Sequence, residues 1–122
     1  MSGNSSEFFI EGLPGSLSQE ESDKLFKMAR QGDKEARNKL ILRNVKLVMY
    51  EVKKRFGFTG FDVEDLVSVG NIGLIKAVET FDKEKGFNFS SYATRCIDNE
   101  IFMYLNKSKS EKVDTSLDKP VV

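Results

Sequence analysis

The sequence predicts an all-α protein, built as a compact bundle of three to four helices. In four stretches of the chain, apolar residues recur three and four positions apart, which is the spacing of one helix face. A Ser or Asp residue, typical of a helix N-cap, precedes each stretch. At 122 residues, the chain is long enough for one domain with a single core.

The composition is that of an ordinary soluble protein, with 39% hydrophobic and 31% charged residues. No apolar run reaches the roughly 20 residues that span a bilayer, and the N-terminus lacks the basic and apolar regions of a secretory signal. A single cysteine, Cys96, and the lack of histidine exclude an intrachain disulfide, histidine catalysis and most zinc sites. We therefore expect a cytoplasmic protein with no cofactor, no bound metal and no membrane partner.

Charge is unevenly distributed, although the formal net charge is +0. Residues 1–23 carry a net charge of −5, residues 24–109 one of +6 and residues 110–122 one of −1. A moderately basic body flanked by acidic ends permits binding to nucleic acid. It is equally compatible with a solvated surface of mixed charge.

The chain is expected to begin with a flexible arm, residues 1–17, followed by a helical domain over residues 18–107. Ser18 and Glu21 form a capping box that starts the first helix. The apolar face of this helix holds Leu25, Met28 and Ala29. Gly32 is the expected C-terminal stop.

Asp33 caps a second, longer helix, which we expect to continue without a break to Phe56. Its apolar face consists of Ala36, Leu40, Ile41, Leu47, Val48, Val52 and Phe56. The loop over residues 57–61 ends it.

Asp62 caps the third helix. The apolar stripe of this helix is Leu66, Val67, Leu74, Ala77, Val78 and Phe81. Gly70 and Gly73 interrupt the stripe, and each costs about 1 kcal/mol of helix stability relative to alanine. Such a cost indicates that something approaches the helix closely, either a packed helix of the same chain or a partner.

The loop over residues 82–89 turns at Gly86, and Ser90 or Ser91 caps the last helix. This helix is expected to end at about Lys107, with Ala93, Ile97, Ile101 and Leu105 as its buried stripe. Residues 108–122 are expected to form a linker.

Enzymatic function is disfavoured by the motifs. The carboxylates of Asp62, Glu64 and Asp65 are explained by a helix N-terminus, where the macrodipole favours negative charge. The chain has no phosphate-binding glycine loop, nucleophile motif or metal cluster. We therefore expect a non-enzymatic protein.

Aromatic residues interleaved with cations offer a stronger indication. Five rings crowd residues 81–102: Phe81, Phe87, Phe89, Tyr92 and Phe102. Tyr92 and Arg95 share a helix face, and Lys83 and Lys85 precede them. Rings of this kind stack on unpaired bases while cations neutralise the backbone, so the pattern favours single-stranded nucleic acid. The alternative is a loop that folds its rings back into the core.

Three strings carry a close resemblance to a known family: NVKLV at residues 44–48, EDLVSVGNIGLIKAVETFD at residues 64–82 and GFNFSSYAT at residues 86–94. In order and spacing they resemble region 2 of the bacterial sigma factors of the sigma-seventy class. The string RCIDNEIFMYL at residues 95–105, LSQEES near Leu17 and DTSLDKP at residues 114–120 are most similar to the mother-cell sporulation sigma factors of endospore formers.

The resemblance implies two partners. One is core RNA polymerase, whose largest-subunit coiled coil would dock on the third helix. The matching positions are Asp65, Ser68, Val69, Asn71, Ile72 and Ile75.

The other implied partner is promoter DNA, through the single-stranded non-template −10 element. Family members melt this element and capture flipped bases. The matching positions are Asn44, Phe81, Asp82, Lys85, Phe87, Phe89, Ser90, Tyr92, Arg95, Asn99, Phe102 and Met103. The resemblance also admits an anti-sigma factor as a partner, and the alternative function is a protein-interaction module without useful DNA affinity.

Two departures from the family pattern stand out. Housekeeping members carry a tryptophan pair as a wedge in the last helix, where this chain has Arg95 and Cys96. We therefore expect weaker melting of poor promoters. The chain also stops near the end of region 2, which suggests a fragment or a truncated product.

Overall fold

The computed structural model describes residues 15–86 and 88–116, with side chains placed as far as residue 108. Over these residues the elements are α2 (Gln19–Arg30), α3 (Lys34–Leu42), α4 (Val45–Phe56), α5 (Val63–Thr80), the 3-10 turn η1 (Lys83–Lys85) and α6 (Phe89–Ser116). This part of the chain contains no strand. The predicted all-α class is confirmed.

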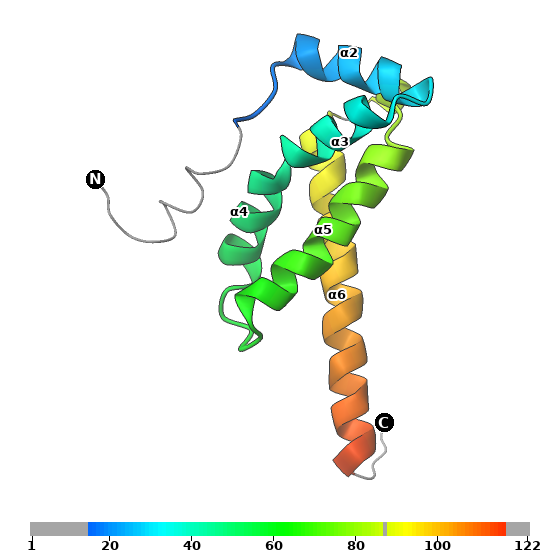
Figure 1. Cartoon of the computed structure of the whole chain (residues 1–122). Coiled ribbons are helices and arrows are strands. Elements are labelled where there is room, and N and C mark those ends of the chain that lie inside the picture. The colour runs from blue at the N-terminus through cyan, green and yellow to red at the C-terminus, as the bar shows by residue number, and fades with distance from the viewer. Residues whose placement is uncertain (1–14, 87, 117–122) are drawn as a thin grey trace, which may run out of the picture.

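Helix α5 crosses α6, and α4 packs against both of them (Figure 1). Helix α2 packs on α3 at the far end of the bundle. The C-terminal half of α6, orange in Figure 1, extends beyond the other helices. No helix in the described ranges is both long enough and apolar enough to cross a membrane.

The predicted caps begin three of the helices. Ser18 and Glu21 form the complete capping box of α2. The Asp33 side chain accepts a hydrogen bond from the Ala36 amide at the start of α3, and Asp62 does the same for Glu64 at the start of α5. Gly32 follows α2 with φ of 99°. These local signals were sufficient to place three helix starts.

The prediction of one unbroken helix from Asp33 to Phe56 is wrong, because the chain bends between α3 and α4. Asn44 has φ of −115° and ψ of 6°. Its backbone amide donates a hydrogen bond to the Ile41 carbonyl at 3.1 Å, while its side-chain amide donates one to the Leu40 carbonyl at 2.7 Å. The side chain thus replaces the bond that an unbroken helix would make to Leu40. Asn is known to compete with the helix backbone in this way.

The last helix differs from its prediction at both ends. It begins at Phe89, and the side chain of Asn88 accepts a hydrogen bond from the Ser91 amide at 2.9 Å. Asn88, rather than Ser90 or Ser91, is therefore the capping residue. The helix continues past Lys107 to Ser116, so its predicted end is also wrong.

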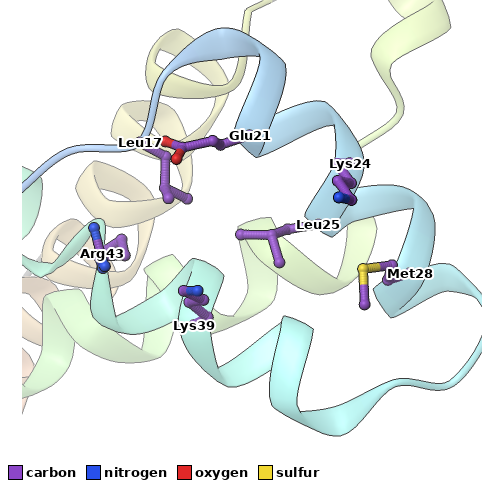
Figure 2. A pocket seen from close by; sticks show the side chains of 7 residues that line it. All are labelled: Leu17, Glu21, Lys24, Leu25, Met28, Lys39 and Arg43. Atoms are coloured by element: carbon purple, nitrogen blue, oxygen red, sulfur yellow. The ribbon is translucent and has the colours of Figure 1, made fainter.

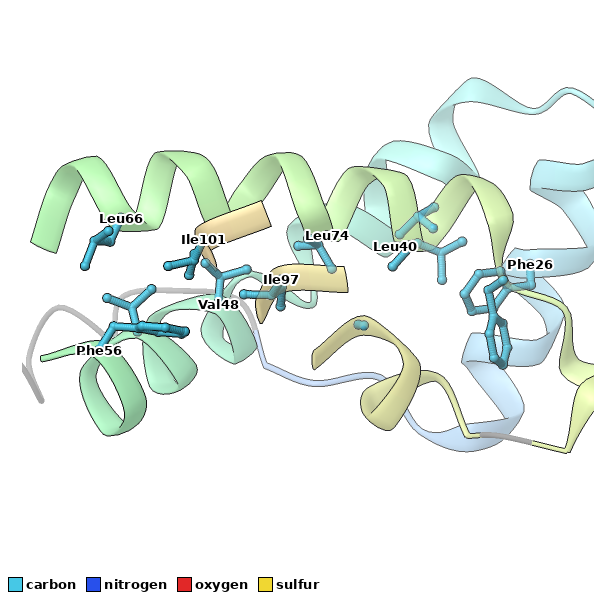
Figure 3. Close-up of a cluster of buried hydrophobic side chains, with 13 residues drawn as sticks. Phe26, Leu40, Val48, Phe56, Leu66, Leu74, Ile97 and Ile101 are labelled. Carbon is cyan, nitrogen blue, oxygen red and sulfur yellow. The ribbon is translucent and has the colours of Figure 1, made fainter. Parts of the chain in front are cut away.

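The hydrophobic core lies along the packed faces of α5 and α6 (Figure 3). Its fully buried large side chains are Leu40, Val48, Val52, Leu66, Leu74, Ile97 and Ile101. All seven belong to the predicted apolar stripes. Two buried apolar residues, Phe26 and Met49, were not predicted. Phe26 lies between Leu25 and Met28 and packs its ring on Phe81 and Phe89.

Candidate docking face and nucleic-acid interface

The outer face of α5 presents Asp65, Ser68 and Ile72 to solvent. These residues lie three and four positions apart, on the side of the helix away from the buried Leu66 and Leu74. Ile72 is 48% exposed, which is unusual for a large apolar residue in a helix with a well-formed core. Val69, Asn71 and Ile75 are half-buried along the flanks of the same face. The six predicted docking residues therefore border one continuous surface.

This surface is weakly charged. Between Asp65 and Lys76 the helix carries no ionisable side chain. At its C-terminal end, Glu79 is paired with Arg37 of α3 at 2.6 Å, which removes much of that charge from the face. A lightly charged, partly apolar strip on a chain with 31% charged residues has the character of a protein contact.

Gly70 and Gly73 serve packing within the chain. A Cβ atom on Gly73 would lie 2.5 Å from the Cys96 carbonyl oxygen and 2.7 Å from the Ile97 Cα. A Cβ atom on Gly70 would lie 2.7 Å from Val48 Cγ1. Of the two explanations open from sequence, close packing of a helix in the same chain is confirmed. These glycines face inward, so close approach of a partner to this face does not depend on them.

Asn71 carries an unusual polar atom at the edge of the docking face. Its Oδ1 is buried and has no hydrogen-bond partner among the described residues. An unpaired buried carbonyl oxygen costs about 1–3 kcal/mol relative to a paired one.

At the other end of the bundle, four rings form an aromatic cluster: Phe26, Phe81, Phe89 and Tyr92. The Phe81 ring centroid lies 5.1 Å from that of Phe26, 5.3 Å from Phe89 and 5.7 Å from Tyr92. Phe81 is only 6% exposed, so its ring supports the neighbouring rings from below and offers no face for a base in this structure. The predicted apolar stripe of the third helix includes Phe81, whereas the predicted buried stripe of the last helix omits Tyr92, so helical spacing already separated the two rings.

Tyr92 is half-buried, and its hydroxyl is anchored. The Thr80 hydroxyl bonds the Lys76 carbonyl at 2.8 Å and the Tyr92 hydroxyl at 2.6 Å. Because a carbonyl only accepts, Thr80 donates to Lys76 and Tyr92 donates to Thr80. The anchor and the Phe81 contact fix the orientation of the Tyr92 ring.

The exposed side of α6 brings five of the predicted nucleic-acid residues together. Tyr92, Arg95, Asn99 and Phe102 line a shallow pocket of about 470 Å³, with Cys96 and Asp98. Asn99 and Phe102 also line a neighbouring pocket of about 420 Å³, which includes Met103. Phe102 is 41% and Met103 56% exposed. The predicted residues of α6 thus form one connected row, the α6 row, of Tyr92, Arg95, Asn99, Phe102 and Met103.

The remaining predicted residues lie outside this row. Lys85 and Ser90 are exposed, and Asp82 is exposed with its side chain accepting the Glu84 amide at 3.0 Å. The Asn44 side chain is committed to the Leu40 carbonyl at the α3–α4 bend. Phe89 is half-buried in the aromatic cluster. Phe87 lies outside the described residues.

The wedge positions of the family contain a cation and a thiol here. Arg95 is exposed, whereas Cys96 is half-buried behind it. Burial raises the pKa of the Cys96 thiol, against the smaller opposing effect of a hydrogen bond with Tyr92. The thiol is therefore in its neutral form at pH 7, and this part of α6 presents no large apolar ring.

A further pocket of about 360 Å³ lies between α2 and α3 and was not predicted (Figure 2). Leu17, Leu25 and Met28 form its apolar floor. Lys24, Lys39 and Arg43 line it with Glu21. Apart from Leu17, its residues come from two predicted helices, but only the packing of these helices brings the cations to one groove.

Comparison with known proteins shows the family of the chain. Residues 40–111 match the family described as Sigma-70 region 2. The chain is 48% identical over 109 residues to an RNA polymerase sigma-28 factor of Bacillus thuringiensis, covering 89% of this chain and 46% of that protein. It is 46% identical over 111 residues to an RNA polymerase sigma-E factor of Clostridium acetobutylicum, covering 91% and 47%.

A third relative is an RNA polymerase sigma-K factor of Bacillus subtilis, 49% identical over 89 residues that cover 73% of this chain and 30% of that protein. The chain spans about half the length of the first two relatives. The family match covers more than half of the chain and includes both the α5 face and the α6 row. The chain belongs to the Sigma-70 region 2 family.

Proposed function

We propose that this chain is a transcription-initiation module that binds core RNA polymerase and the promoter −10 element. It is non-enzymatic and acts in the cytoplasm. The observation that carries the proposal is the α6 row, where a fixed tyrosine ring, an arginine, an amide and an exposed phenylalanine share one surface. The relatives named sigma-E and sigma-K support the resemblance to the sporulation branch.

Polymerase docking is assigned to the outer face of α5. Exposed Ile72 supplies an apolar anchor, and the lightly charged surroundings need little desolvation on contact. The largest-subunit coiled coil is the partner that the family resemblance implies. An anti-sigma factor would use the same kind of surface.

Base capture is assigned to the α6 row. A flipped base costs a few kcal/mol to unstack, and stacking on an aromatic ring returns about 1–3 kcal/mol. The Thr80 hydroxyl and the Phe81 ring fix the orientation of the Tyr92 ring. Tyr92 therefore loses little conformational entropy when a base binds. Arg95 and Lys85 supply positive charge beside the phosphates, and Phe81 acts as a support for the ring above it.

The test is fluorescence anisotropy with a labelled single-stranded −10 non-template oligonucleotide, with and without core polymerase. We expect tighter binding than to a scrambled oligonucleotide, at least in the presence of core enzyme. Equal binding of both oligonucleotides under both conditions contradicts promoter recognition. Retained binding to core polymerase in that case would favour the protein-interaction module.

Replacement of Tyr92 by alanine should weaken oligonucleotide binding by about tenfold, because the stacking platform is lost. Binding to core polymerase should be unchanged. Tyr92→Phe is the matched variant, since it keeps the ring and loses only the hydroxyl bond to Thr80; it should retain most of the affinity. If Tyr92→Ala weakens both activities equally, Tyr92 is a structural residue and not a base contact.

A further inference from the structure

Helices α4 and α6 bury two carboxyl groups that are close enough to share a hydrogen bond, those of Glu51 and Asp98. Glu51 of α4 is 8% exposed and Asp98 of α6 is 9% exposed. Among the described residues, these are the two charged side chains that the fold buries. Two ionised carboxylates in such a place repel each other and lose their hydration, so the pair requires a proton or a cation.

One cation pairs directly with Asp98: Arg55 Nη1 lies 3.3 Å from Asp98 Oδ2. The buried Asp98 Oδ1 accepts no hydrogen bond unless the neighbouring Glu51 carboxyl is protonated and donates to Asp98. One guanidinium beside two carboxyl groups leaves one negative charge uncompensated if both groups ionise. The arrangement therefore favours one neutral and one charged carboxyl.

Arg55 also touches the α6 row. Its guanidinium carbon lies 5.6 Å from the centroid of the Phe102 ring, within the range of a cation–π contact. The Phe56 ring also contacts Phe102, with ring centroids 5.3 Å apart and an interplanar angle of 74°. Phe102 thus contacts both a charged group and a core ring, and Asp98 pairs with the charged group.

We propose that Glu51 and Asp98 are positioning residues for Phe102: while Glu51 is neutral, Asp98 alone engages Arg55 and keeps its guanidinium against the ring. When Glu51 ionises, it repels Asp98 and draws Arg55 toward itself, and Phe102 loses its fixed partner. This inference rests on the proposed function, because it matters only if Phe102 contacts DNA.

The charge state of Glu51 changes in an accessible pH range. Burial, and then the neighbouring Asp98, raise the pKa of Glu51 to about 7, while Arg55 and Lys54 act in the opposite direction. Among the described residues, Asp98, Arg55 and Lys54 are the charged groups that act on Glu51. The folded state therefore holds a proton on Glu51 at pH values where the unfolded chain, with a pKa near 4.5, has released it.

The sign of the stability effect follows from linkage. A carboxyl whose pKa is raised by folding stabilises the folded state most at low pH, and the contribution falls as pH rises from about 4.5 through about 7. Glu51→Gln imitates the neutral form at every pH. The melting temperature of the natural chain should therefore fall relative to that of Glu51→Gln between pH 5 and pH 8.

The direct test is an NMR titration that follows the Phe102 ring and the Glu51 carboxyl carbon from pH 5 to pH 8.5. We expect both signals to change with one midpoint near pH 7 in the natural chain, and the Phe102 signals to stay constant in Glu51→Gln. Asp98→Asn should give the high-pH Phe102 signals throughout. A Phe102 ring that ignores pH in the natural chain overturns the inference, whether or not the chain binds DNA.

Oligonucleotide binding is the second readout. Affinity should fall by about threefold to tenfold from pH 6 to pH 8, the size expected when one cation–π contact is lost. Glu51→Gln at pH 8 should bind as the natural chain does at pH 6. An NMR transition accompanied by no oligonucleotide binding at any pH would contradict the proposed function alone. A pH-dependent affinity that persists unchanged in Glu51→Gln would contradict the inference alone.

Discussion

Gly73→Ala is expected to destabilise the folded chain by about 2 kcal/mol, a fall of about 10 °C in melting temperature. The added methyl would meet the Cys96 carbonyl oxygen at 2.5 Å and the Ile97 Cα at 2.7 Å. Both are backbone atoms, so the clash is relieved only if α5 and α6 move apart. Overpacking of this kind costs about 3 kcal/mol, and the better helix propensity of alanine returns about 1 kcal/mol.

Thermal unfolding followed by circular dichroism measures this effect. Gly70→Ala is an informative comparison, because its methyl would meet the Val48 side chain, which has more freedom to adjust than backbone. Ser68→Ala on the exposed face of the same helix controls for propensity and should be neutral or slightly stabilising. If Gly73→Ala and Ser68→Ala have the same melting temperature, the close approach of α5 to α6 does not exist in solution.

Ile72→Glu is expected to weaken binding to core RNA polymerase by about 30-fold or more, as loss of a central apolar anchor does at a protein interface. Ile72 is 48% exposed and contributes nothing to the buried core cluster, so the melting temperature should stay the same. The substitution both removes the apolar contact and buries a new charge on docking.

Surface plasmon resonance with immobilised core enzyme measures this loss. Val63→Glu is the matched control, since it places a carboxylate at another exposed apolar position of the same helix, in its first turn and outside the docking residues. Oligonucleotide binding in the absence of core enzyme should be unaffected by Ile72→Glu. Full retention of polymerase affinity would remove the outer face of α5 as the docking site.

Sequence patterns were sufficient for the elements whose cause is local. Ser18, Asp33 and Asp62 each begin a helix as their capping chemistry predicts, and the apolar stripes of α5 and α6 become the core. The bend at Asn44 was missed because apolar spacing continues through it. What breaks the helix is one side-chain amide that takes over a backbone bond, a competition that periodicity does not record.

The residues of the candidate sites likewise separate into those predictable along one helix and those placed by contacts between helices. The α6 row follows from helical spacing along one element, so Tyr92, Arg95 and Asn99 were predictable as neighbours. The burial of Phe81 was predicted by the apolar stripe of α5, but its contact with Phe26, a residue from another helix, was not. The Glu51–Asp98 pair joins positions far apart in the chain, and neither residue carries a local signal. Contacts between helices therefore decide which predicted residues face solvent and which support them.

The continuity of α6 sets a register for whatever binds along it. From Tyr92 to Met103 the helix rises by about 16 Å at about 1.5 Å per residue, the length of about five nucleotides at roughly 3.4 Å spacing. Backbone hydrogen bonds keep this length constant, so the helix fixes the distances between the side chains of the α6 row. One residue inserted between Arg95 and Asn99 would turn Tyr92 by about 100° relative to Phe102. The two rings would then point in different directions around the helix axis, and no single stretch of DNA would reach both.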